Sequence, residues 1–282
     1  MNAARKHFKT IVVVGYGVLL GLVVFVALSF ARTRMAQSEG VVLAYLAYAL
    51  LAPFAIAVAW YLNLRFNNLG PRQWGLYGRR PARNFFSGFG LGMLGSIGVT
   101  VTAASLFADI DIRLQSPLSG SETGILSLLL FTLTTAIWEE HLFRGFVLVT
   151  LLKRGLSIVA ACLLSALVFT LPHVVWGNPL AHPLSLAAIF SLGVLMGYGY
   201  VLTGSIWIAC GLHFAWNLAV EVIQYRDIGI LSVPNYAEIR TELELVEVVV
   251  LILLAAAVSG WLVRKSPTAR LQLEVTRGQQ IR

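Results

Sequence analysis

The sequence predicts an all-α, polytopic integral membrane protein: a bundle of about eight transmembrane helices with the N-terminus and the C-terminus in the cytoplasm. Three observations support this fold class. The 282 residues are 58% hydrophobic and only 12% charged, which is far too apolar for a soluble domain of this size. The hydrophobic residues form runs long enough to span a bilayer, which takes about 17 to 25 residues. Lysine and arginine are concentrated in the connections on one side of the predicted membrane.

The apolar runs divide the chain into eight candidate membrane spans. In chain order they cover residues 10–31, 41–63, 85–107, 123–152, 156–175, 184–203, 205–222 and 243–263. Basic residues before the first run also describe a secretory signal peptide. Its apolar core, however, exceeds the roughly 7 to 15 residues typical of such a peptide, so we expect an uncleaved first helix.

The orientation follows from the distribution of positive charge. With the N-terminus inside, fifteen of the 21 lysines and arginines fall on the inner side, five fall on the outer side, and Arg144 lies within a span. This is the bias of the positive-inside rule. The net charge of +8 is then explained by topology and by contact with anionic lipid headgroups, and no nucleic-acid partner is expected.

The spans fall into three segments. Residues 1–122 hold three helices without an interior ionisable residue, rich in glycine and separated by a basic cytoplasmic loop, and are expected to be scaffold. Glycines at such spacings let membrane helices approach closely. Residues 123–222 hold four helices and the polar residues described below. Residues 223–282 hold an outer loop, the last helix and a basic cytoplasmic tail.

The fourth run carries three charges in its middle: Glu139, Glu140 and Arg144. Its sixteen Leu, Ile, Val and Phe residues favour insertion by roughly 8 kcal/mol, at about 0.5 kcal/mol each. Each unpaired charge at the membrane centre costs about 2.5 to 3.5 kcal/mol, so three of them would cancel nearly all of that gain. We therefore expect the cluster to face the protein interior or a wet cavity, where an intramembrane charge indicates function.

Helical geometry divides the cluster. At about 100° per residue, Glu140 and Arg144 lie about 40° apart, whereas Glu139 and Arg144 lie about 140° apart. Glu140 is the natural ion-pair partner of Arg144, and Glu139 is left free to accept a proton from water.

Two later runs carry polar pairs at helical spacing. Phe169 and His173 are four residues apart, as are His213 and Asn217, so each pair shares a helix face. A hydrolytic site needs a base and an orienting group for water, which Glu139 and His173 can provide. It also needs donors for the oxyanion, which His213 and Asn217 can provide.

The same side chains leave a metal site open. Glu139, His173 and His213 match the ligand set of a catalytic zinc with one open position. A zincin motif is absent, because His141 follows Glu140 directly. The two cysteines, Cys162 and Cys210, both lie within spans and form neither a disulfide framework nor a Cys-rich zinc site.

Three motifs in this order, Glu139-Glu140-x-x-x-Arg144, Phe169-x-x-x-His173 and His213-x-x-x-Asn217, resemble those of the CPBP family. This family includes the CAAX prenyl endopeptidases of the Ras-converting type and bacterial Abi-type membrane proteins.

The resemblance implies an intramembrane endopeptidase of membrane-associated or lipidated proteins, in a bacterial inner membrane. It implies that Glu139 and His173 activate water, that His213 and Asn217 form the oxyanion site, and that Glu140 and Arg144 support the geometry. It favours a glutamate mechanism without a metal cofactor, with zinc as the alternative.

Two other functions fit part of this pattern. A non-catalytic scaffold or a bacteriocin-immunity-type binding protein would explain Glu140 and Arg144 as a structural ion pair, but it leaves Glu139, His173, His213 and Asn217 as separate coincidences. A proton-coupled transporter could use the same groups as a relay. Many such transporters contain inverted repeats, and the two halves of this chain show none.

Overall fold

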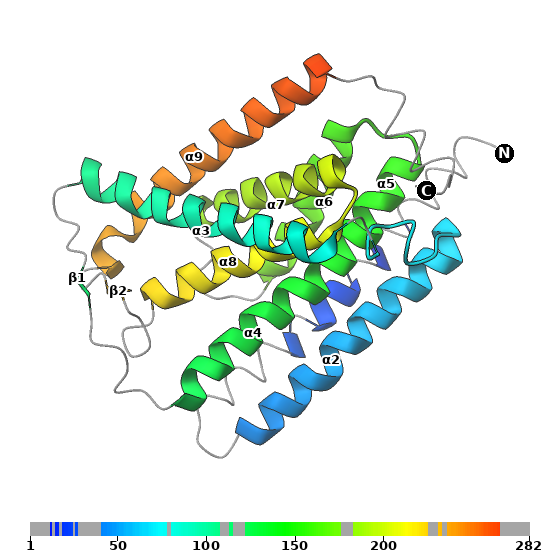
Figure 1. Ribbon diagram of the computed structural model, residues 1–282, viewed down its shortest axis with the longest axis horizontal. Coiled ribbons are helices and arrows are strands. Elements are labelled where there is room, and N and C mark those ends of the chain that lie inside the picture. The colour runs from blue at the N-terminus through cyan, green and yellow to red at the C-terminus, as the bar shows by residue number, and fades with distance from the viewer. Residues whose placement is uncertain are drawn as a thin grey trace.

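The protein is a bundle of helices (Figure 1). The computed structural model describes residues 12, 15–16, 19–24, 26–27, 41–77, 80–107, 113–114, 122–175, 183–224, 231–232 and 236–265. The α-helices are α2 (Val41–Leu62), α3 (Pro81–Leu106), α4 (Glu122–Glu140), α5 (Val149–Lys153), α6 (Ile158–Val175), α7 (Pro183–Thr203), α8 (Ile206–Gln224) and α9 (Tyr236–Lys265). Two π-helices, η1 (Asn63–Asn67) and η2 (His141–Leu148), continue α2 and α4. The helical prediction is confirmed over this part of the chain.

Helices α2 and α9 lie on opposite sides of the bundle, with α4, α6, α7 and α8 between them (Figure 1). Within the described residues, Pro81–Leu106, Pro183–Thr203 and Arg240–Gly260 are long and apolar enough to cross a membrane, and Ile158–Val174 is a shorter apolar helix. The count of eight spans remains a prediction. So does the cytoplasmic location of both termini, because residues 1–11 and 266–282 lie outside the described part.

Helix α3 packs closely along α8 because glycines on each helix lie against the backbone of the other. A Cβ on Gly88 would lie 2.0 Å from the Ile208 carbonyl oxygen, and a Cβ on Gly211 would lie 2.0 Å from the Phe85 carbonyl oxygen. No side chain fits at either position without separating the helices. The expectation that glycine serves close packing is confirmed for Gly88, and α3 thereby fixes the position of α8.

The fourth predicted span is one continuous helical rod, 122–153, but its middle is not α-helical. His141–Leu148 forms a π-helix, in which each N–H bonds to the carbonyl five residues earlier instead of four. Every residue of η2 is buried. The first predicted span contributes to this burial, since a Cβ on Gly21 would lie 3.1 Å from the Phe143 ring. Most of the rod therefore lies inside the bundle.

A short β pair interrupts the all-helical pattern. Strand β1 (Arg113–Leu114) follows α3, and β2 (Leu231–Ser232) follows α8. They pair antiparallel, with Arg113 opposite Ser232. Apolar periodicity does not predict strands of two residues.

Candidate active site

The charged cluster lies inside the protein, as its cost in lipid predicts. Glu139 and Glu140 end α4, and Arg144 lies in η2; their exposed fractions are 2%, 0% and 0%. Arg144 Nη1 lies 2.7 Å from Glu140 Oε1. The pairing that helical spacing predicts is therefore confirmed, although the backbone is π-helical from residue 141 onwards.

The Arg144 guanidinium also contacts two other helices. Its Nη2 donates a hydrogen bond of 2.9 Å to the Gly193 carbonyl on α7. Its Cζ lies 4.6 Å from the centroid of the Phe169 ring on α6, where the ring face attracts a cation. A Cβ on Gly193 would lie 3.2 Å from the Phe169 ring, so the absence of a side chain lets the two helices approach. Glu140 is thus one of three groups that hold this cation.

His213 connects α8 to both carboxylates. Its Nδ1 lies 2.9 Å from Glu140 Oε1 and its Nε2 lies 3.7 Å from Glu139 Oε2. The imidazole is 3% exposed. A carboxylate accepts hydrogen bonds and does not donate them, so the nitrogen that faces Glu140 carries a proton. Glu140 and His213 belong to separate sequence motifs, and the sequence gives no indication that they touch.

Phe169 brings the two histidines to one place. The centroid of its ring lies 5.4 Å from that of His173 and 5.7 Å from that of His213. His173 Nδ1 lies 3.1 Å from the Phe169 carbonyl oxygen one turn earlier on α6. If Nδ1 donates this bond, Nε2 is left as the acceptor. Asn217 lies one turn beyond His213 on α8 and is half-buried, which places both residues on the same helix face.

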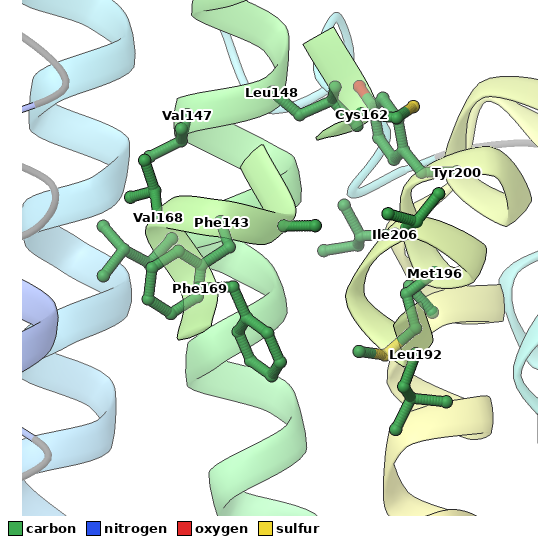
Figure 2. Close-up of a cluster of buried hydrophobic side chains, with 14 of the residues drawn as sticks. Phe143, Val147, Leu148, Cys162, Val168, Phe169, Leu192, Met196, Tyr200 and Ile206 are labelled. Atoms are coloured by element: carbon green, nitrogen blue, oxygen red, sulfur yellow. The ribbon is translucent and has the colours of Figure 1, made fainter. Parts of the chain in front are cut away.

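Phe169, which contacts Arg144 and both histidines, belongs to a cluster of buried apolar side chains that includes residues of η2, α6 and α7 (Figure 2). Phe143 and Phe169 lie edge to face, with ring centroids 5.2 Å apart. Leu192 and Met196 of α7 lie on the opposite side of the cluster in Figure 2. Apolar surroundings lower the local dielectric constant and thereby strengthen the electrostatic interactions of the neighbouring charged groups.

Three buried polar atoms of the cluster have no hydrogen-bond partner within the described chain: Glu139 Oε2, Glu140 Oε2 and Arg144 Nε. Buried polar atoms in native proteins are nearly always hydrogen-bonded, to protein or to water. The Glu139 carboxylate in particular has an oxygen that can accept a hydrogen bond from a water or a substrate.

The side chain of His141 makes a backbone hydrogen bond and packs against aromatic rings. Its Nδ1 lies 2.7 Å from the Ile137 carbonyl oxygen, and its ring packs edge-on against Trp74 and Trp207. These contacts hold it among aromatic rings.

The metal alternative receives no geometric support from the described residues. Within this part of the chain, no three His, Cys, Asp or Glu side chains are grouped so that they could hold a metal ion. Glu139, His173 and His213 therefore do not form a ligand set as they stand here. His213 is instead directed to Glu140 through Nδ1.

Part of the chain matches a known protein family. Residues 121–219 match the family described as type II CAAX prenyl endopeptidase Rce1-like. The matched segment begins one residue before α4 and ends within α8, so it covers all six predicted site residues. No curated protein matches the chain significantly.

Proposed function

We propose that the protein is an intramembrane endopeptidase, on the premise that residues 121–219 match the family described as type II CAAX prenyl endopeptidase Rce1-like. It hydrolyses peptide bonds in membrane-associated or lipidated protein substrates. The observation that supports this proposal best is the buried contact of His213 with the carboxylates of Glu139 and Glu140. A structural ion pair between Glu140 and Arg144 does not require a second carboxylate and an imidazole beside it.

Glu139 acts as the base. It takes a proton from water as the water oxygen forms a bond to the carbonyl carbon of the scissile peptide. The C–N bond then breaks, and the departing nitrogen receives the proton from Glu139. The oxygen of Glu139 that lacks a partner within the described chain gives the attacking water an acceptor.

His173 orients the same water. Its Nδ1 faces the Phe169 carbonyl oxygen, so the tautomer that donates this bond presents Nε2 as an acceptor towards water. To orient water, the His173 ring must keep one orientation. Its contact with the Phe169 ring restricts its rotation.

His213 and Asn217 stabilise the oxyanion that forms on the carbonyl oxygen. With Nδ1–H donating to Glu140, Nε2 can donate to the oxyanion only in the imidazolium form. Two carboxylates beside the ring compensate its positive charge. The side-chain amide of Asn217 supplies the second donor from the same helix face. Preorganised donors of this kind typically account for a large share of rate enhancement.

Glu140 and Arg144 hold the donors in place. One oxygen of Glu140 accepts from both the guanidinium and the imidazole, and the guanidinium is anchored to the Gly193 carbonyl. The pair thereby connects α4, α7 and α8 without contacting substrate. The reaction proceeds without a metal ion.

Comparison of protein termini in membranes identifies the substrates. The N-termini and C-termini of membrane proteins are measured in cells that express the native protein or Glu139→Gln. We expect truncated termini with the native protein that are lost with Glu139→Gln, and retained with the control Glu242→Gln, which alters a half-buried glutamate on α9.

A scaffold or immunity-type protein gives a different result: Glu139→Gln retains its biological effect, and no terminus changes. That outcome would overturn the proposed peptidase. A transporter would change ion or solute fluxes and also leave the termini intact.

A further inference from the structure

One hydrogen bond connects the first segment of the chain directly to the backbone beside Arg144. The side-chain Nδ2 of Asn63 donates 2.9 Å to the Gly145 carbonyl oxygen, across 82 residues of sequence. Asn63 is fully buried and is the first residue of η1, where α2 ends. It lies outside the segment that matches the peptidase family.

The accepting carbonyl lies in an unusual part of the backbone. Gly145 is in the middle of η2, and π-helical turns are rare and occur frequently at functional sites. Apolar packing alone does not favour this turn over an α-turn. A bond from a neighbouring helix to a carbonyl within η2 adds a direct constraint on its geometry.

Gly145 also lies against the Trp74 side chain. A Cβ on this glycine would lie 2.8 Å from two ring carbons of Trp74, so the η2 backbone lies directly against the indole. Arg144, the preceding residue, extends to Glu140 and Gly193. The backbone that carries the guanidinium is therefore held by Asn63 and Trp74, both from the first segment of the chain.

Asn63 is itself held by a buried polar network. Asn67 Nδ2 donates 3.0 Å to Asn63 Oδ1 and 2.7 Å to the Thr150 hydroxyl. The Lys153 ammonium donates to the Asn67 carbonyl. The network contacts the rod at Gly145, within η2, and at Thr150, just after η2 ends. A network of this kind restricts the Asn63 amide to one orientation.

We propose that Asn63 is a positioning residue for the active site: its amide fixes the η2 backbone at Gly145 and thereby the Arg144 guanidinium that holds Glu140 and His213. Residues 41–77 thus take part in assembling the site and are not scaffold alone. The inference rests on the proposed peptidase function for its kinetic consequence, but its structural claim can be measured without activity.

A double-mutant cycle tests whether Asn63 acts through Arg144. Native protein, Asn63→Leu, Arg144→Lys and the double variant are purified in detergent and assayed on a membrane-tethered peptide. We expect Asn63→Leu to lower kcat at least tenfold and to change KM less than twofold. In the Arg144→Lys background the same change lowers the residual kcat less than twofold, because the guanidinium fork that Asn63 positions is already absent.

The matched control is Tyr61→Leu, two residues earlier on the same helix, where the side chain is 62% exposed. It leaves kcat and KM within twofold of native. An equal loss of kcat on Asn63→Leu in both backgrounds would indicate a general structural role and would overturn the inference.

Thermal unfolding of the same four proteins provides a readout that does not require cleavage. We expect Asn63→Leu to lower Tm by less than half as much in the Arg144→Lys background as in the native background. Additive Tm shifts would overturn the inference. A native protein without Glu139-dependent cleavage would instead overturn the proposed function, and the Tm cycle alone would then decide the role of Asn63.

Discussion

The His213 imidazole on α8 lies 2.9 Å from the Glu140 carboxylate at the end of α4, although 73 residues separate them in sequence. This contact has a chemical consequence, because it fixes one ring nitrogen as a donor to Glu140 and directs the other towards Glu139.

Replacement of His213 by Ala is expected to lower kcat about 100-fold to 1,000-fold, the usual cost of removing one oxyanion donor. KM should change little, because the donor acts on charge that develops in the transition state. Steady-state kinetics on a membrane-tethered peptide, normalised to folded protein, check this. A variant whose KM rises while kcat stays constant would assign His213 to substrate binding instead.

Arg144→Met leaves the buried Glu140 charge without its cation and should lower the free energy of unfolding by about 3 to 5 kcal/mol. Both side chains are completely buried, so solvent does not compensate the loss. The double variant Glu140→Gln with Arg144→Met should recover a large part of that stability, because the carboxylate that the guanidinium neutralises is removed with it. Unfolding in detergent measures the stability of the single and the double variants. Additive losses would mean that Glu140 and Arg144 contribute to stability independently of each other.

Helix α3 provides a matched pair of glycines. Gly88→Ala should destabilise the protein by about 1 to 3 kcal/mol through overpacking, because its Cβ would overlap the Ile208 backbone. Gly90→Ala should be neutral or slightly stabilising, since nothing lies within 4 Å of its Cβ and Ala favours a helix by up to about 1 kcal/mol. Equal effects on Tm would contradict the close approach of α3 and α8.

Chelators distinguish the two mechanisms for water activation. Since cleavage is proposed to depend on Glu139 without a metal, treatment of the purified protein with 1,10-phenanthroline and EDTA should leave the rate within twofold of the untreated value. Inactivation that added zinc reverses would replace the glutamate mechanism with a zinc site formed by Glu139, His173 and His213.

The sequence predicts much of this arrangement because the membrane imposes simple rules. Apolar runs give α4 to α8 to within a few residues, since length and hydropathy determine where a helix can cross lipid. The Glu140 to Arg144 pair follows from helical spacing alone. The glycine pattern of α3 predicts close packing, which Gly88 confirms.

These rules do not predict the tertiary contacts of the site. The bond from His213 to Glu140 depends on the register of α8 against α4, and the bond from Arg144 to the Gly193 carbonyl depends on a backbone atom that any residue possesses. The π-helical turn in η2 has no counterpart in hydrophobic periodicity. A search of the spans for ionisable residues does not predict the bond from Asn63 to Gly145, because the first three spans have none in their interiors. The asparagine side chain at the end of the second span was the signal that could have indicated it.

Cleavage by purified Glu139→Gln protein is the most direct test of the central claim. Native protein and the variant are reconstituted in liposomes with a farnesylated CAAX peptide or a membrane-tethered peptide found through its altered terminus, and product is measured by mass spectrometry. We predict cleavage by the native protein and a rate at least about 100-fold lower for Glu139→Gln, at an unchanged Tm, since a general base contributes about 100-fold to 10,000-fold. Cleavage by the variant at the native rate would contradict the account.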